Sequence, residues 1–146
     1  MAIERMDHIG IVVDDLGEAI EFFVALGLEP LGDPVVVEGE WVDDIVGLTG
    51  ARSEIAFVQT PDGQTQLELT QFQSPLYEGD DPPPPANAPG IRHLTFRVDD
   101  IDAVLEAARA HGAELVGELG RYKDIYRLCY VRGPAGIIVE LAQKIG

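Results

Sequence analysis

Two histidines and two glutamates stand where their side chains could act together on a divalent cation. His8 and His93 each open a short apolar stretch, and Glu68 and Glu140 each lie within another. A carboxylate inside the run Ile-Ile-Val-Glu-Leu is costly unless it is paired or coordinated. Imidazole nitrogens and carboxylate oxygens suit zinc, nickel, cobalt, manganese or iron, with open positions for water or substrate. We therefore predict one divalent metal ion held by His8, Glu68, His93 and Glu140.

An internal repeat relates these four residues in pairs. The stretch HIGIVVDDL from His8 matches HLTFRVDDI from His93 at an offset of 85 residues, which persists through the following helix. Glu68 follows the proline of a Pro-Asp-Gly sequence by seven residues, and Glu140 follows the proline of Pro-Ala-Gly by six. In the competing interpretation each residue is a separate core or surface residue with its own hydrogen-bond partners. That interpretation does not explain why both the histidines and the glutamates occupy equivalent positions of the repeat.

The repeat predicts the same elements in each half: a strand, a helix and three further strands. The first strands are expected at 7–13 and 92–98. Each is followed by Asp-Asp, which favours a helix N-cap, and each helix is expected to end at Gly27 or Gly112. Further extended segments are expected at 28–32, 53–60 and 64–72 in the first half, and at 114–120, 124–132 and 136–144 in the second.

Alternation along the strands decides where the four candidate ligands point. In the first strand one set of alternate residues is wholly apolar and suits packing against the helix, so His8 is directed to the opposite, concave side. The same reasoning puts His93, Glu68 and Glu140 on the concave side of their own strands.

Two segments depart from the repeat. An insertion at 33–52 contains residues 40–47, which are expected to form a short helix. Its apolar residues, Trp41 among them, would plug the core, the commoner arrangement, or line a pocket wall. The proline-rich segment 74–90 is expected to be an extended, semi-rigid linker.

The composition excludes several classes of protein. A chain of 146 residues with 46% hydrophobic content suits a single domain. A formal charge of −16 disfavours nucleic acid as a partner. No apolar run is long enough to cross a bilayer and the N-terminus has no hydrophobic signal core, so a soluble, cytoplasmic protein is expected. Cys129 is the only cysteine, which fits a reducing compartment.

These motifs resemble the vicinal-oxygen-chelate superfamily, which includes glyoxalase I, methylmalonyl-CoA epimerase, extradiol dioxygenases and bleomycin- or fosfomycin-resistance proteins. The resemblance rests on DHIGIVVDDLGEAIEFFVALGLE, PDGQTQLELT, IRHLTFRVDDIDAVLEAARAHGAE and GPAGIIVEL. It implies an α+β fold in which two tandem βαβββ modules form an incomplete barrel around a metal site. One domain would span residues 1–146, with module one at 5–73, the linker at 74–90 and module two at 91–144.

By that resemblance His8, Glu68, His93 and Glu140 stand at the four ligand positions, a set nearest to glyoxalase I and methylmalonyl-CoA epimerase. Such a protein would be a metal-dependent lyase or isomerase. Glu140 or Glu68 would remove a proton next to a carbonyl as general base, and the metal would stabilise the developing enediolate. The expected partners are a small-molecule substrate and a second copy of the chain, in a homodimer.

The resemblance leaves the substrate open. Arg97, Arg121, Lys123 and Arg127 could bind a substrate carboxylate, and Trp41 could clasp an aromatic compound. One alternative is a non-catalytic small-molecule binding protein of the antibiotic-binding type, without a metal. A dioxygenase of the same fold is disfavoured by Glu68 at a fourth ligand position, and a thiol transferase is the remaining alternative.

Overall fold

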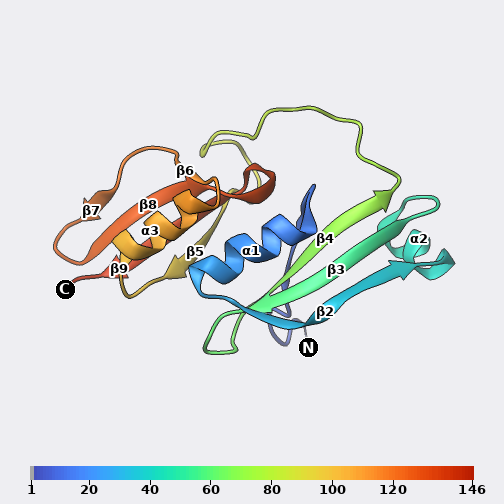
Figure 1. Ribbon diagram of the computed structural model, residues 1–146, viewed down its shortest axis with the longest axis horizontal. Helices are drawn as coiled ribbons and strands as arrows, with labels where there is room; N and C mark the ends of the chain where they lie inside the picture. The colour runs from blue at the N-terminus through green and yellow to red at the C-terminus, as the bar shows by residue number, and fades with distance from the viewer. Residues whose placement is uncertain (1) are drawn as a thin grey trace. The chain divides into compact units, whose positions relative to one another are not determined.

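The computed structural model describes residues 2–146, which form two sheets and three α-helices. The chain divides into two compact units, Met1–Asp80 and Asp81–Gly146, called unit 1 and unit 2 below. Each unit begins with a strand and a helix and continues with further strands, and the helix lies along one face of that unit's sheet (Figure 1). The predicted mixed α+β class is therefore confirmed.

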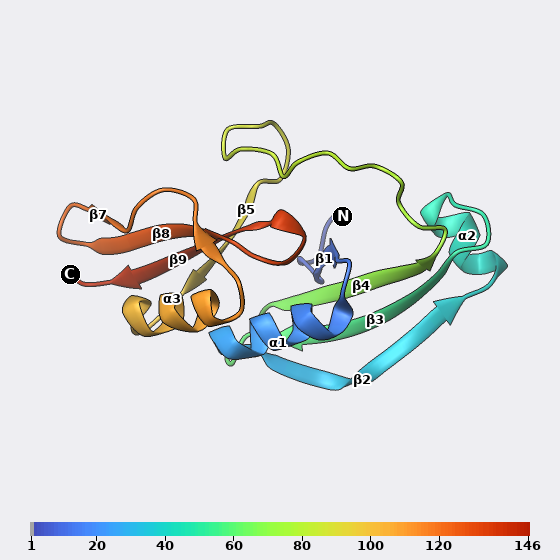
Figure 2. The same cartoon turned by 45° about the horizontal axis from the view of Figure 1, so that its top comes forward.

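Unit 1 contains a four-stranded sheet in the order β1-β4-β3-β2. Its strands are β1 Ile9–Val12, β2 Glu29–Glu38, β3 Arg52–Gln59 and β4 Gln66–Ser74, and its helices are α1 Leu16–Leu26 and α2 Glu40–Val46. β1 runs parallel to β4, whereas β4, β3 and β2 are antiparallel neighbours. α1 packs against this sheet (Figure 2). The buried residues of this unit include Phe22 and Phe23 of α1 and Val58, Leu67 and Leu69 of the sheet.

Unit 2 repeats this arrangement around β9. Its elements are β5 His93–Arg97, α3 Ile101–Ala110, β6 Glu114–Leu115, β7 Gly120–Tyr122, β8 Tyr126–Arg132, a 3-10 turn at Pro134–Gly136 and β9 Ile138–Lys144. The sheet order is β5-β9-β8-β6, with β7 also paired to β8. β5 is parallel to β9, as β1 is to β4. Ile101, Val131 and Leu141 are fully buried between α3 and the sheet.

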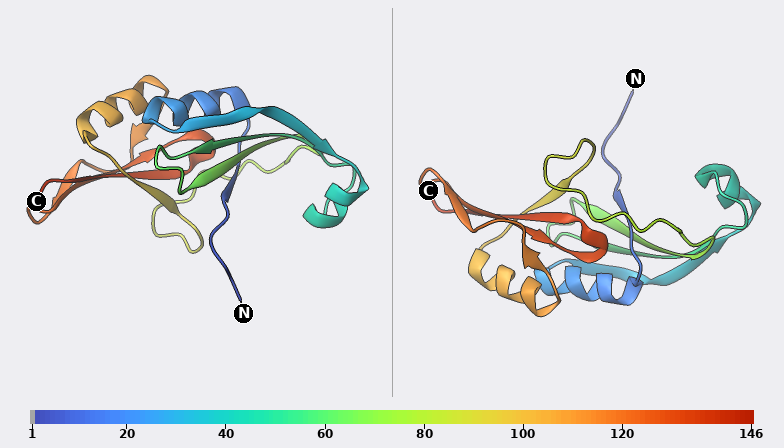
Figure 3. Two further views of the ribbon diagram at one scale, coloured as in Figure 1. Left: turned by 90° about the horizontal axis from the view of Figure 1, so that it is seen from below. Right: turned by 90° about the horizontal axis from the view of Figure 1, so that it is seen from above.

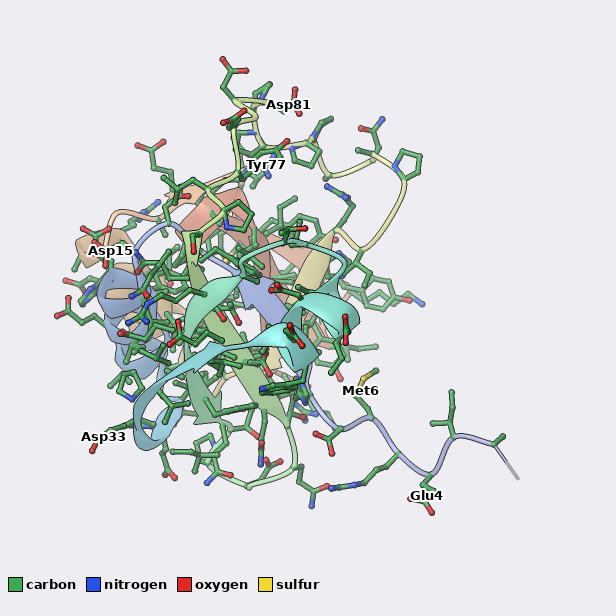
Figure 4. All side chains as sticks on the ribbon, turned by 90° about the vertical axis from the view of Figure 1, so that its right-hand side faces the viewer. Glu4, Met6, Asp15, Asp33, Tyr77 and Asp81 are labelled. Atoms are coloured by element: carbon green, nitrogen blue, oxygen red, sulfur yellow. The ribbon has the colours of Figure 1, made fainter. Side chains whose placement is uncertain are left out.

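The starts of the two long helices are built in the same way, as the Asp-Asp pairs predict. The carboxylate of Asp15 accepts a hydrogen bond from the backbone N–H of Glu18 at 3.0 Å, which identifies Asp15 as the N-cap of α1 (Figure 4). Asp100 caps α3 through Ala103 at 3.1 Å. Such caps satisfy backbone donors that have no partner inside the helix. α1 ends at Gly27, in the left-handed conformation with φ 115°.

A second polar contact ties each helix to the last strand of its unit. The side-chain oxygen of Gln71 on β4 accepts a hydrogen bond from the backbone N–H of Leu16 at 2.8 Å. Gln143 on β9 accepts from Ile101 in the same way at 2.9 Å. Each glutamine lies three residues after its unit's candidate glutamate. The helices and the candidate strands are thus fixed to one another within each unit.

The second strand departs from the sequence prediction in both units. β2 continues to Glu38 rather than ending at Gly32, with an irregular register between Leu31 and Val35. Gly32 has φ 71° and the next residues are Asp33, which Figure 4 marks, and Pro34, which has no N–H to donate. In unit 2 the expected strand 114–120 is divided into β6 and β7.

The insertion in unit 1 forms the short helix that was predicted, but the helix does not plug the core. α2 extends beyond the end of the sheet (Figure 3) and buries only Val42, while Trp41 and Ile45 are 61% and 74% exposed. Of the two expected arrangements, the one in which Trp41 and Ile45 fill the core is therefore wrong, and the one in which they line a pocket wall stays a prediction. With about two turns of helix, only one apolar position faces inward. Asp43 holds the helix in place by accepting hydrogen bonds from the backbone N–H groups of Gly50 and Ala51.

Residues 75–92 connect β4 to β5 without a helix or strand. Among residues 2–146, no helix is long and apolar enough to span a membrane.

Candidate functional site

In unit 1 the two predicted ligands face each other. His8 directly precedes β1, and Glu68 lies on the neighbouring strand β4, where it is paired in register with Gly10. The Nε2 atom of His8 is 3.3 Å from Oε2 of Glu68. The ring of Phe57, on β3 opposite Glu68, meets the His8 imidazole edge-on with centroids 5.5 Å apart. Both candidate side chains are partly accessible, at 35% for His8 and 26% for Glu68.

The second ring nitrogen of His8 makes a hydrogen bond that orients the imidazole toward Glu68. Nδ1 of His8 lies 2.8 Å from Oδ1 of Asp7. The pKa of Asp7 lies below its ordinary value, mainly because of this hydrogen bond, and the positive charge of Arg5 contributes. An ionised carboxylate only accepts, so Nδ1 of His8 donates to Asp7, and Nε2 is the ring nitrogen that faces Glu68.

Unit 2 contains the equivalent pair. The Nε2 atom of His93, the first residue of β5, is 3.5 Å from Oε1 of Glu140 on β9. The hydroxyl of Thr95 donates to the same oxygen at 2.7 Å. The Tyr130 hydroxyl is 3.5 Å from Nδ1 of His93, and the two rings have centroids 5.1 Å apart. Glu140 is the more enclosed of the two glutamates, with 17% of its side chain exposed.

The distances within each pair fit two ligands of one cation. Nitrogen and oxygen donors lie about 2.0–2.2 Å from zinc, and two donors of a tetrahedral site are therefore about 3.3–3.6 Å apart. The observed separations of 3.3 Å and 3.5 Å lie in or at the edge of this range. Within residues 2–146, no group of three or more His, Cys, Asp or Glu side chains is gathered as a metal cluster. Each unit thus supplies a His–Glu pair, which we call a half-site.

Sequence reasoning did not assign a role to the groups that orient the half-sites. These are Asp7 and Thr70 in unit 1, where the Thr70 hydroxyl donates to Glu68 at 3.2 Å, and Thr95 and Tyr130 in unit 2. Tyr130 is paired in register with Glu140 as Phe57 is with Glu68, so the aromatic partner of each histidine follows the repeat. That correspondence was available from the sequence once the last two strands of each half were aligned.

The cationic residues predicted to contact a substrate carboxylate are differently placed. Arg97 lies over the ring of Tyr126 at 5.8 Å, and Lys123 over Tyr122 at 5.3 Å. Arg121 forms an ion pair of 3.2 Å with Asp124. All three cationic residues belong to unit 2.

Arg127 instead forms an ion pair within unit 2 that links two of its elements. Its guanidinium donates two hydrogen bonds to Asp102 on α3, at 2.9 Å and 3.0 Å. This contact is the main reason that the pKa of Asp102 is lowered and that of Arg127 is raised. A bidentate pair of this kind joins β8 to α3. Trp41, the remaining weak candidate, lies exposed on α2 in unit 1.

A shallow, open depression lies beside Glu140 in unit 2. Its volume is about 380 Å³, and its lining includes Glu118, Arg121, Leu128, Tyr130 and Glu140. The loop between β6 and β7, which arches away from β8 in Figure 1, supplies part of the wall. The second half-site therefore borders a space that could admit a small ligand.

The fold agrees with comparison to known proteins. Residues 7–130 match the model of the Glyoxalase/Bleomycin resistance protein/Dioxygenase superfamily. This range covers most of the chain, and the protein belongs to this superfamily. The resemblance identified from sequence is thereby confirmed.

Two relatives match along nearly their whole length. The solved structure of a glyoxalase family protein from Bacillus cereus is 43% identical, covers 100% of this chain and 97% of that one, and superposes with a TM-score of 0.93. The uncharacterized protein YwbC of Bacillus subtilis is 29% identical over 144 residues, which is 97% of this chain and 98% of YwbC.

More distant structures share the fold with quite different roles. TnmS3, an antibiotic binding protein from Streptomyces, is 23% identical with a TM-score of 0.60, over 99% of this chain and 98% of TnmS3. The fosfomycin resistance protein FosX from Listeria monocytogenes, solved with Mn(II) and sulfate, is 15% identical with a TM-score of 0.59, over 97% and 93%. At these identities the likeness concerns the fold alone.

Proposed function

We propose that the protein is a metal-dependent lyase or isomerase that removes a proton from a carbon next to a carbonyl group. The proposal is carried by one repeated observation: in each unit a histidine Nε2 faces a glutamate oxygen, at 3.3 Å in unit 1 and 3.5 Å in unit 2. We assign His8, Glu68, His93 and Glu140 to one divalent cation, bound within one chain or across a homodimer. Two nitrogen and two oxygen donors leave room in the coordination sphere for substrate.

The protein's own groups would handle the proton. When bound, the cation supplies a Lewis acid for two neighbouring oxygens of the substrate. Glu140 or Glu68 accepts the proton as general base and returns it to the adjacent carbon or to the opposite face of the same carbon. Thr95 holds one carboxylate oxygen of Glu140 at 2.7 Å, which fixes the orientation of that base.

Metal content is the first test. Elemental analysis of the untagged protein should find about one equivalent of a divalent metal for each set of four ligands, and His93→Ala should lose it. His111→Ala is the matched control, because His111 lies at the C-terminal end of α3, outside both half-sites. If the wild-type protein stays metal-free after supplementation, the proposal fails.

Turnover is the second test. Candidate substrates are adducts of 2-oxoaldehydes with thiols and 2-substituted acyl thioesters, and exchange of the carbon-bound proton in D₂O reports the chemistry directly. Glu140→Gln should abolish exchange and leave the circular dichroism spectrum unchanged. Glu106→Gln, an equivalent change at an exposed position of α3, should exchange at the wild-type rate. Full exchange by Glu140→Gln would remove Glu140 from the mechanism.

A second candidate is a small-molecule binding protein without a metal. It is favoured by the exposed apolar residues of α2, Trp41 and Ile45, and by the fold shared with the antibiotic binding protein TnmS3. Quenching of the fluorescence of Trp41, the only tryptophan, would report an aromatic ligand at α2. The absence of metal combined with such quenching would favour this function over the enzyme.

A further inference from the structure

We propose that the substrate carries a carboxylate several bonds away from its reacting carbon, and that Arg97, on the same face of the unit 2 sheet as Glu140, recognises this carboxylate. The inference rests on the proposed function, because it names the substrate class for the same chemistry. The residues that carry it all belong to unit 2.

The two faces of the unit 2 sheet are distinguished by their contacts. α3 covers one face (Figure 3), and Arg127 of β8 and Gln143 of β9 form hydrogen bonds with this helix and its first turn. Successive side chains of a strand point to opposite faces, so Tyr130 and Glu140 lie on the other face. We call this the Glu140 face.

Two neighbouring strands assign Arg97 to the Glu140 face. The hydroxyl of Thr95 donates to Glu140 at 2.7 Å, and Arg97 follows Thr95 by two residues on β5. The guanidinium of Arg97 lies over the ring of Tyr126, 5.8 Å from its centroid, and Tyr126 precedes Tyr130 by four residues on β8. The alternation along β5 and the contact with β8 therefore agree.

The strand register shows which residues lie between Glu140 and the guanidinium. Ala142 follows Glu140 by two residues on β9, and it is paired with Arg97 on one side and with Leu128 on the other. Both Ala142 and Leu128 are apolar, and the short side chain of Ala142 rises little above the sheet. A carbon chain laid along this row would meet an apolar surface.

The length of the substrate follows from the spacing of the strands. Residues of one face are about 6.8 Å apart along a strand, because each residue advances it by about 3.4 Å. Arg97 is one such step beyond Thr95, and Tyr126 is two steps beyond Tyr130 in the same direction. The positive charge therefore lies about 7–14 Å from the row of Glu140. Since an extended chain advances about 1.2 Å per bond, a carboxylate about five or more bonds from the reacting carbon would reach Arg97.

Arg97 is available for a ligand, whereas two other arginines of unit 2 are paired. Arg121 and Arg127 form ion pairs with aspartates. Arg97 is exposed, and no acidic side chain within residues 81–146 forms an ion pair with it. A guanidinium that stacks on an aromatic ring keeps the N–H groups at its edge free to bind the two oxygens of a carboxylate.

The distribution of charge favours unit 2 for such a ligand. Residues 1–80 carry 17 acidic and 2 basic side chains, whereas residues 81–146 carry 9 acidic and 8 basic ones. An anion is therefore repelled much less by unit 2 than by unit 1. Because the whole chain has a formal charge of −16, a singly charged carboxylate is opposed less than a doubly charged phosphate.

Two matched pairs of ligands test the recognition and its distance. Isothermal titration calorimetry would compare 2-oxosuberate with 2-oxooctanoate, in which a methyl group replaces the distal carboxylate, on the full-length protein with and without one equivalent of Zn²⁺. A charge-assisted contact with Arg97 should make 2-oxosuberate bind about 10- to 100-fold more tightly. The shorter 2-oxoglutarate should show less than about threefold preference over 2-oxopentanoate, because its distal carboxylate lies about two bonds from the reacting carbon and does not reach Arg97.

Two arginine variants complete the test. Arg97→Gln should remove the preference for 2-oxosuberate, and Arg109→Gln, the same change at an exposed position of α3, should keep it. If Arg97→Gln does not fold, Arg97→Lys should still lower the preference at least about threefold, because lysine lacks the planar fork of arginine. An unchanged preference in these Arg97 variants, or none in the wild-type protein, overturns the inference, as does an equal preference for 2-oxoglutarate.

The outcomes separate this inference from the proposed function. Metal binding without the preference for 2-oxosuberate would refute the inference alone. A preference that depends on Arg97 in a protein that takes up no metal would refute only the proposed function.

Discussion

The contact between Asp7 and His8 gives a prediction that follows from geometry alone. Asp7 lies 2.8 Å from Nδ1 of His8 and thereby fixes both the tautomer and the direction of Nε2 toward Glu68. In unit 2 the corresponding group is the Tyr130 hydroxyl, at 3.5 Å from Nδ1 of His93. That distance is at the outer limit for a hydrogen bond. Loss of Asp7 should therefore weaken metal binding more than loss of the Tyr130 hydroxyl.

The size of the difference follows from these distances and from exposure. Removal of a carboxylate that orients a metal-bound histidine costs about 10- to 100-fold in metal affinity. The Asp7 side chain is 69% exposed, so water can replace part of its interaction, and we expect about tenfold for Asp7→Ala. Asp7→Asn keeps an acceptor without the charge and should fall between Asp7→Ala and the wild type. Tyr130→Phe should change the affinity by less than about threefold.

The assay is competition for Zn²⁺ with a chromophoric chelator of known affinity, at fixed pH and ionic strength. Asp44→Asn is the control for charge, because Asp44 is exposed on α2 and makes the same change in net charge. If Tyr130→Phe weakens binding more than Asp7→Ala, the argument from hydrogen-bond length is refuted. If Asp44→Asn has the effect of Asp7→Asn, the loss is due to general charge.

Three further predictions concern the fold that carries the half-sites. Leu69→Ala should lower the free energy of unfolding by about 2–5 kcal/mol in urea titrations, because Leu69 is completely buried beside Glu68; a loss near zero would mean that this core is not formed. The pKa of Asp102 is lowered by Arg127, so this pair stabilises the fold above the ordinary pKa of an aspartate, and the benefit is lost as the pH falls through the lowered value. Asp102→Asn should therefore differ from the wild type in thermal stability at pH 7 and converge with it once the pH falls below the lowered pKa of Asp102, and a constant difference would contradict this origin. Burial raises the pKa of the Cys129 thiol, so Ellman's reagent at pH 7.5 should react more than about tenfold faster in urea than with the folded protein. Equal rates would show that the thiol is accessible.

The repeat explains why so much of the fold could be predicted from sequence. Alternation of apolar residues along the first strands depends on the burial of one face, and Ile11 and Val13 are buried while Val12 is 59% exposed. Helix starts were predictable because an aspartate carboxylate is a local acceptor for backbone N–H groups, as Asp15 and Asp100 show. The aspartate N-caps and the alternation of apolar residues along the first strands could therefore be predicted in both units.

Contacts between distant positions account for what the sequence did not predict. Arg127 was one of four cationic residues that could bind a substrate carboxylate, yet it pairs with Asp102, which is 25 residues away and on another element. The division of the expected strand 114–120 depends on how β8 is covered, which no local pattern records. The burial of α2 was overestimated because the amphipathic pattern of one short helix does not show whether a surface exists to receive it.

The differences between the half-sites are as informative as the repeat. The duplication explains why each unit has a histidine and a glutamate, but it does not explain why Asp7 orients one histidine and Tyr130 the other. An exposed carboxylate favours firm binding of a cation in unit 1, where the surface is strongly acidic. In unit 2 the corresponding group is a hydroxyl, and residues 81–146 carry nearly equal numbers of acidic and basic side chains. The repeat therefore supplied the same His–Glu pair twice, and divergence of the neighbouring residues made the surroundings of the two pairs chemically different.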